Sequence, residues 1–269
     1  LELRVLGPMQ LRRDGTVVVA RELRRERVRQ LLGYLLTHDR PTRAAVTADL
    51  WPDLDEVAAA RNLRVTLAYL HALLEPDRLE PDAPYFVRST GPILHLVVDE
   101  ALQVDAVEFE RHLDEAARLE RQGVPSAALA AYQQALALWD TDFLPDVSGG
   151  DWLQWERDRL RGRFVGAAVR AGELLLARGD AATARTLGER ALGVDSWSEE
   201  AHQLLVAALL ESGDVADARR QLRRCLQALA ELGAAAQPRT VALARRLEVH
   251  RGRSADGLPT PLRSRLTSG

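Results

Sequence analysis

The sequence feature that most constrains the fold is an internal repeat beyond residue 100, in which a glycine is followed 12 residues later by a small residue. The pairs are Gly123 and Ala135, Gly179 and Ala191, and Gly213 and Cys225. The last two pairs are 34 residues apart. A 34-residue period, with glycine in the turn and small residues where paired helices pack, is typical of tetratricopeptide-type (TPR-like) helical hairpins. Residues 101–250 are therefore predicted to form helical repeats, with a non-repetitive helical bundle as the alternative.

The first hundred residues predict a smaller domain of strands and helices. Short apolar runs separated by turn residues indicate strands, and a change to helical periodicity follows. The expected elements are a hairpin around Asp14-Gly15, helices over 22–36, 43–51 and 58–75, and a second hairpin over 85–99. Thr42 is the expected N-cap of the second helix. This order of elements is typical of a winged helix-turn-helix with an N-terminal sheet.

Strand signals are absent beyond residue 101, which places a domain boundary near residue 100. The predicted fold is mainly α: a winged helix-turn-helix (small α+β) in residues 1–100, followed by an all-α TPR-like helical repeat domain in residues 101–250. Residues 251–269 are rich in Arg, Ser, Gly and Pro without periodicity, and are expected to be a flexible tail or linker.

Composition excludes several classes of protein. Cys225 is the only cysteine, so neither an intrachain disulfide nor a cysteine-based zinc site is expected. No apolar run approaches the ~18 residues of a membrane span, and no signal peptide is evident, which favours a cytoplasmic protein with no membrane partner. The first residue is Leu rather than Met, which leaves room for an upstream sensor or ATPase domain in a longer protein.

No catalytic, cofactor-binding or metal-binding site is predicted. Phosphate-loop, dinucleotide-binding, nucleophile-elbow and zinc-protease motifs are all missing from the sequence, and its six histidines lack ligand spacing. The protein is therefore not expected to be an enzyme. In the helical half, four tryptophans could belong to the core or to an interface, with the core as the default: Trp139, Trp152, Trp155 and Trp197.

The helix expected over 58–75 is a candidate for DNA recognition. At 100° per residue its leucines form one inward stripe, while polar and small residues lie on the opposite face. The outward face centres on Arg61, with Asn62 and Tyr69 at one border and Arg64 at the other. Arg and Asn side chains suit paired hydrogen bonds with guanine and adenine edges. The alternative is an ordinary amphipathic helix with solvated arginines.

Neighbouring elements favour DNA recognition. Arg43 lies at the start of the preceding helix, where the Thr42 hydroxyl and the helix-start amides could seat a phosphate. Arg88 precedes Ser-Thr-Gly in the second hairpin, and is expected at a wing tip that enters a minor groove. Bulk charge gives no such support, since residues 1–100 hold 14 Arg against 15 Asp plus Glu, a net of −1.

Several motifs carry a resemblance to known regulators. The block LWPD…ARNLRVTLAYLHALLEP followed by FVRSTG resembles the OmpR/PhoB-type winged helix. The whole order of elements resembles the Streptomyces antibiotic regulatory protein (SARP) family, whose winged helix is followed by a bacterial transcriptional activation domain. Supporting motifs include RVLGPMQLRRDG, VDAVEFERHL, WLQWERDRLRGRF, ARGDAATARTLGERAL and LAELGAAAQPRTVAL. The resemblance covers about residues 2–249.

The resemblance implies a sequence-specific transcriptional activator that binds direct repeats in promoter DNA as a homodimer and recruits RNA polymerase through its sigma and core subunits. It further implies a role for individual residues. Arg61 would bind phosphate, Arg64, Thr66 and Tyr69 would face base edges, and Arg88 would be the wing arginine.

Two departures from the family pattern predict modest affinity for DNA. The family usually has a basic residue after the core leucine, and often another beside it, where this chain has Leu70-His71-Ala72. A residue before that leucine, often Arg, is Tyr69. Each lost phosphate contact weakens binding and flattens its salt dependence. The alternative function is therefore a TPR-like protein-interaction or ligand-sensing module whose winged domain binds DNA weakly or not at all.

Overall fold

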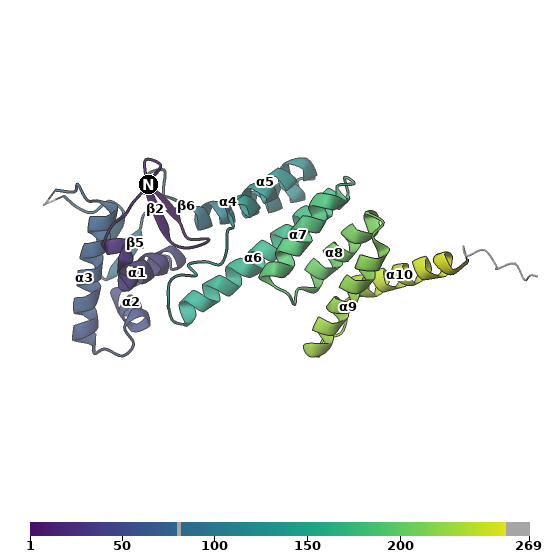
Figure 1. Cartoon of the computed structure of the whole chain (residues 1–269). Coiled ribbons are helices and arrows are strands. Elements are labelled where there is room, and N and C mark those ends of the chain that lie inside the picture. Colours follow the sequence, from purple (N-terminus) through teal and green to yellow (C-terminus); the bar gives the residue numbers. More distant parts are fainter. Residues whose placement is uncertain (80–81, 257–269) are drawn as a thin grey trace, which may run out of the picture. The chain divides into compact units, whose positions relative to one another are not determined.

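The computed structural model describes residues 1–79 and 82–256 and consists mainly of helices, with strands confined to the N-terminal part (Figure 1). Its contacts divide the chain into two compact units, Leu1–Ala167 and a second that begins at Ala168. The boundary expected near residue 100 falls inside the first unit, so the proposed domain limits stay a prediction. The predicted fold class, a winged helix with TPR-like helices after it, is confirmed.

The N-terminal sheet contains β1 (Glu2–Arg4), β2 (Gln10–Arg13), β3 (Thr16–Val17) and β6 (Gln103–Val104), in the order β3-β2-β1-β6. The β2–β3 hairpin turns at Asp14 and Gly15, whose φ angles of 51° and 76° are left-handed, as a tight Asp-Gly turn requires. The parallel pairing of β6 with β1 corrects the expectation that strands end before residue 101. Two residues are too few to show an alternating pattern, and β6 forms because β1 offers a free edge.

Three helices follow β3 in the chain: α1 (Glu26–Thr37), α2 (Arg43–Leu50) and α3 (Glu56–Leu74). A short 3-10 turn, η1 (Glu22–Arg24), precedes them. The Thr42 hydroxyl accepts a hydrogen bond from the Ala45 amide at 3.1 Å, which confirms the predicted N-cap of α2. Asp55 caps α3 in the same way, accepting from the Ala58 amide at 2.8 Å. The hairpin β4 (Val87–Thr90) and β5 (Ile93–Leu96) completes the winged helix.

Asp105 connects the first strand to the helices that follow the winged domain. It begins α4 (Asp105–Arg121), which pairs with α5 (Pro125–Leu138). Its carboxylate accepts hydrogen bonds from the amides of Val5 at 2.8 Å and Leu6 at 3.1 Å, just beyond β1. The Ala106 amide donates to the same group at 2.8 Å. Burial raises the pKa of Asp105 above its usual value despite these three backbone donors. The winged part and α4 therefore fold against each other within one unit.

The remaining helices form antiparallel hairpins. Their bounds are α6 (Asp151–Leu176), α7 (Ala181–Val194), α8 (Glu199–Glu211), α9 (Val215–Glu231) and α10 (Pro238–Asp256). Gly179 and Gly213 adopt φ angles of 81° and 82° at equivalent turns, after α6 and after α8. Twelve residues later, Ala191 and Cys225 are 0% and 1% exposed. The spacing that predicted paired helices with small residues at the contact is therefore confirmed.

Helix α10 is attached to α8 by a buried polar network. The Glu199 carboxylate accepts from the Gln237 amide at 2.7 Å and from the Thr240 hydroxyl at 2.5 Å. The Gln203 side chain donates to Thr240 at 2.9 Å. The expected tail is corrected in part, because α10 extends through 251–256. The rest of that segment, 257–269, lies outside the described residues.

Candidate nucleic-acid interface

Helix α3 buries one side and exposes the other, as the periodicity predicted. Leucines 63, 67, 70 and 74 are at most 5% exposed. On the opposite face Arg61, Asn62 and Arg64 are exposed, and Val65 is 46% exposed. Among the described residues neither Arg61 nor Arg64 has an ion-pair partner. Two guanidinium groups and one amide are thus available on a single helix face.

Thr66 does not belong to this exposed face. Its side chain is 6% exposed, and its hydroxyl donates a hydrogen bond of 2.8 Å to the Asn62 carbonyl one turn earlier in the helix. This placement corrects the expectation that Thr66 faces base edges. At 100° per residue from Leu63, Thr66 lies at about 300°, on the buried side of the helix.

Two open grooves border the exposed face of α3. One lies between α2 and α3, has a volume of about 580 Å³, and includes Arg43 and Arg64; we call it the α2 groove. The other has a volume of about 630 Å³ and includes Arg25, Asn62 and Tyr69; we call it the Arg25 groove. Arg64 and Tyr69 lie at about 100° and 240° on the helical wheel, so the grooves are on opposite flanks.

Arg25 is a candidate residue that sequence reasoning missed. It is exposed, immediately precedes α1, and its guanidinium carbon lies 3.9 Å from the centre of the Tyr69 ring. That distance is within the range of a cation–π contact. Only the tertiary fold brings position 25 against position 69. The sequence signal was weak, because the segment 21–29 is rich in arginines and does not distinguish one from another.

The wing, which is the hairpin of β4 and β5, contacts the start of α2. The Arg43 guanidinium donates to the Ser89 hydroxyl at 3.0 Å, and the Arg43 amide donates to the Pro92 carbonyl at 2.7 Å. Because the Ala45 amide is used by the Thr42 cap, two of the helix-start amides expected to bind phosphate are already occupied. Arg43 itself is half-buried and remains at the edge of the α2 groove.

Arg88 lies lower on the wing than expected. It is the second residue of β4, while the turn at the tip is formed by Gly91 and Pro92. Its Nε donates to the Tyr85 carbonyl at 2.9 Å, and its guanidinium lies 5.0 Å from the Tyr85 ring. The expectation of a guanidinium at the wing tip is therefore wrong, since these contacts direct Arg88 toward the base of the hairpin.

His71, where the family usually has a basic residue, connects α3 to the wing. Its Nε2 lies 3.1 Å from the Val87 carbonyl, a separation that suits an Nε2–H donor. Burial lowers the pKa of His71 below its usual value, more than the bond to Val87 raises it. A neutral imidazole bonded to the wing adds no charge for phosphate. This position instead links α3 to β4 through one hydrogen bond.

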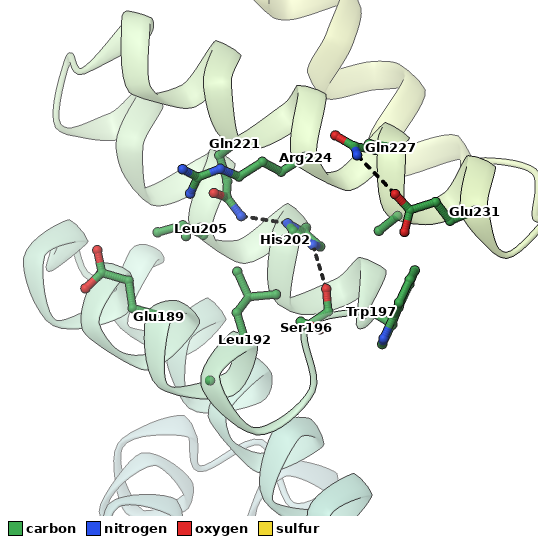
Figure 2. A pocket seen from close by; sticks show the side chains of 12 residues that line it. Glu189, Leu192, Ser196, Trp197, His202, Leu205, Gln221, Arg224, Gln227 and Glu231 are labelled. Atoms are coloured by element: carbon green, nitrogen blue, oxygen red, sulfur yellow. Dashed lines mark hydrogen bonds between the residues drawn. The ribbon is translucent and has the colours of Figure 1, made fainter.

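The second unit contains a separate hollow of about 530 Å³ among α7, α8 and α9 (Figure 2). Trp197, at 44% exposure, forms one wall, and Leu192 and Leu205 contribute apolar lining. His202 is 5% exposed at the back of the hollow, with Gln221 Nε2 2.6 Å from its Nδ1 and the Ser196 carbonyl 3.1 Å from its Nε2. Trp139 and Trp152 are buried as expected, whereas Trp155 and Trp197 are exposed and correct that expectation.

Because His202 is buried, we expect the folded protein to lose stability in mild acid. Burial lowers the pKa of its imidazole in the folded protein, more than its bond to Ser196 raises it. As pH falls below about 6.5 the unfolded chain binds this proton while the folded chain resists it, so the free energy of unfolding decreases. Urea titrations at pH 7.5 and 5.5 should show this decrease, and a smaller one in His202→Gln. An equal decrease in both proteins would assign the effect to other groups.

Neither a metal site nor a membrane-spanning helix is found in the described part of the chain. No cluster of three or more His, Cys, Asp or Glu side chains there is arranged to hold a metal ion. Within the same residues, every helix is too short or too polar to span a membrane.

Comparison with known structures supports the fold. The structure of Mycobacterium tuberculosis EmbR in complex with a low affinity phosphopeptide matches with a TM-score of 0.77 at 20% sequence identity. The match covers 93% of this chain but 65% of the EmbR chain, so this chain spans less than two thirds of EmbR. At this identity the likeness shows the fold alone.

Two TPR structures match with lower scores. The C-terminal TPR-containing domain of a Plasmodium falciparum FK506-binding protein has a TM-score of 0.43 at 15% identity, covering 57% of this chain and 94% of that one. The Sgt2 TPR domain from Aspergillus fumigatus has a TM-score of 0.42 at 16% identity, covering 60% and 91%. No match was found among curated protein sequences.

The fold and the exposed face of α3 define a winged helix-turn-helix protein with TPR-like repeats. A model of the bacterial transcriptional activator domain matches residues 104–248, more than half of the chain. The chain belongs to this family of transcriptional regulators, which is not a class of enzymes. The match confirms the resemblance to SARP-type regulators drawn from the sequence.

Proposed function

We propose that the protein is a transcriptional activator whose winged helix binds specific double-stranded DNA, with α3 in the major groove. The observation that carries this proposal is the exposed set Arg61, Asn62 and Arg64 above a fully buried leucine stripe. Arginine and asparagine are the side chains that pair most specifically with guanine and adenine edges. Arg43 at the α2 groove would hold the adjacent phosphate backbone, and Arg88 would contact DNA beside the wing.

The helical repeats would supply the activating function. The family match supports a role of residues 104–248 in transcription activation. We assign to them the contacts with RNA polymerase, through its sigma and core subunits, and with a second copy of the chain on direct repeats. Tandem binding would compensate for the modest affinity expected of one winged helix with a net charge of −1.

Selection from a random duplex library tests this function. The full chain should enrich one sequence motif, and on the enriched duplex its affinity should exceed that for a scrambled duplex by about 10³-fold or more. A duplex with two directly repeated motifs should bind two protomers, and removal of one motif should leave one. Measurement by fluorescence anisotropy at several salt concentrations separates specific from electrostatic binding.

The second candidate function, a protein-interaction or ligand-sensing module, is favoured by the hollow at Trp197. An exposed indole beside apolar lining and a few polar groups has the composition of a ligand site. The same selection experiment decides between the two functions. If no duplex is retained at ~50 mM salt, where electrostatic attraction is strong, the DNA-binding proposal is wrong and the interaction module replaces it.

A further inference from the structure

We propose that Arg25, positioned by the Tyr69 ring, binds a phosphate of the DNA strand on the flank of α3 opposite Arg43 and Arg64. This inference rests on the proposed function and adds to it a residue from outside the helix-turn-helix. Arg25 would touch the DNA backbone directly. Tyr69 would be a positioning residue that acts through Arg25.

The need for such a residue follows from the geometry of a helix in a major groove. The groove is about 12 Å wide, so a helix inside it is bordered by the phosphates of both strands. Arg43 and Arg64 both line the α2 groove and serve one border. On the other border, α3 contributes Asn62, Val65 and Tyr69, none of which carries a positive charge. In this groove α3 therefore offers that strand no cationic side chain, and the cation must come from another element.

Arg25 is the best candidate for this position, because the neighbouring Arg27 and Arg29 already use their guanidinium groups in other contacts. Arg27 also lines the Arg25 groove, but its guanidinium donates to the Gln30 side chain and to the Leu50 carbonyl, so part of its donor capacity is already used. Arg29 is paired with Glu26 and Asp146. Arg25 has no ion-pair partner in the described part of the chain, and it contacts the face of Tyr69. Arg25 therefore borders α3 in contact with Tyr69 and with no carboxylate to neutralise its charge.

Stacking on Tyr69 suits a guanidinium to phosphate binding. A guanidinium over an aromatic ring leaves its N–H groups free at the edge of the plane, where they can donate to phosphate oxygens. The ring also orders a side chain that would otherwise lose conformational entropy on binding. Tyr69 is half-buried and Arg25 exposed, so the pair is ordered on one side and accessible on the other. The charge expected at position 69 is thus supplied from position 25.

Salt-dependent binding of the full chain to the selected duplex tests this inference. Arg25→Ala should weaken binding about three- to tenfold near 0.15 M salt and lower the slope of log K against log salt by about 0.9, the share of one phosphate contact. Tyr69→Phe keeps the ring and should keep both values. Tyr69→Leu should reproduce part of the loss, and adding Arg25→Ala to it should cost less than Arg25→Ala alone.

Arg24→Ala is the matched control, because Arg24 is an adjacent exposed arginine that does not line the Arg25 groove. Equal losses in the two variants would show that only the bulk charge of the segment matters, and would overturn the inference. If Arg64→Ala weakens binding while Arg25→Ala leaves affinity and salt slope unchanged, the inference fails and the proposed function stands. If the unchanged protein retains no duplex, both fail. Arg25→Gln replaces Arg25→Ala should the alanine variant melt at a lower temperature.

Discussion

Replacement of Arg64 by alanine is expected to weaken binding to the selected duplex by about 1–3 kcal/mol, roughly 5- to 150-fold, and to relax the preference for one base pair. Arg64 is exposed on α3, lines the α2 groove, and has no ion-pair partner among the described residues. Its planar guanidinium can therefore donate two parallel hydrogen bonds to a guanine edge. Competition binding with single-base variants of the duplex measures both effects.

Two further variants separate base recognition from charge. Arg64→Lys keeps the charge but loses the paired donors, so it should retain the salt slope and lose most of the base preference. Arg118→Ala removes an exposed arginine of the same unit that is paired with Glu115 on α4, and it should bind like the unchanged protein. Unaltered base preference in Arg64→Ala would show that α3 does not contact bases through this face.

Replacement of Asp105 by alanine is expected to lower the free energy of unfolding of the first unit by about 2–4 kcal/mol. The carboxylate accepts from three backbone amides, those of Val5, Leu6 and Ala106, and an unsatisfied, partly buried amide costs about 1–3 kcal/mol. Stabilities of most domains are about 5–15 kcal/mol, so this loss is a large fraction of the total. Urea denaturation followed by tryptophan fluorescence measures it.

Asp105→Asn is the informative comparison. It keeps one side-chain oxygen as an acceptor, and it removes a charge whose raised pKa shows that burial disfavours the ionised form. Its loss of stability should therefore be smaller than that of the alanine variant. An isolated fragment 1–100, which lacks both β6 and Asp105, should be less stable than 1–167. Equal stability of the two fragments would contradict the role assigned to Asp105.

Local signals were strong where the chain forms hairpins and helices. The Asp14-Gly15 turn, the Thr42 cap and the leucine stripe of α3 depend on neighbours within a few residues, so the sequence predicts them directly. The glycine at 179 predicts a helix end for the same reason, because few other residues adopt a left-handed φ without strain. By contrast β6 was missed, since a two-residue strand exists only through its partner β1.

In the candidate interface, too, some placements follow from local sequence pattern and others depend on packing. The exposure of Arg61, Asn62 and Arg64 follows from the helical period alone, and the structure agrees with it. For Thr66 the role at base edges was implied by the resemblance, whereas the helical period places it on the buried side, where the structure also finds it bonded to the Asn62 carbonyl. Arg88 was expected at the wing tip, but its register in β4 and its bond to Tyr85 place it lower.

The sequence by itself therefore determined the winged helix, the repeat of helical hairpins and the outward face of α3, because periodicity and turn chemistry act over short distances. Only the tertiary structure decided what completes that face. Arg25 reaches Tyr69 across more than forty positions, His71 bonds to the wing rather than bearing charge, and Asp105 joins α4 to the first strand. Contacts between distant positions depend on how the elements pack, and no local pattern in the chain encodes them.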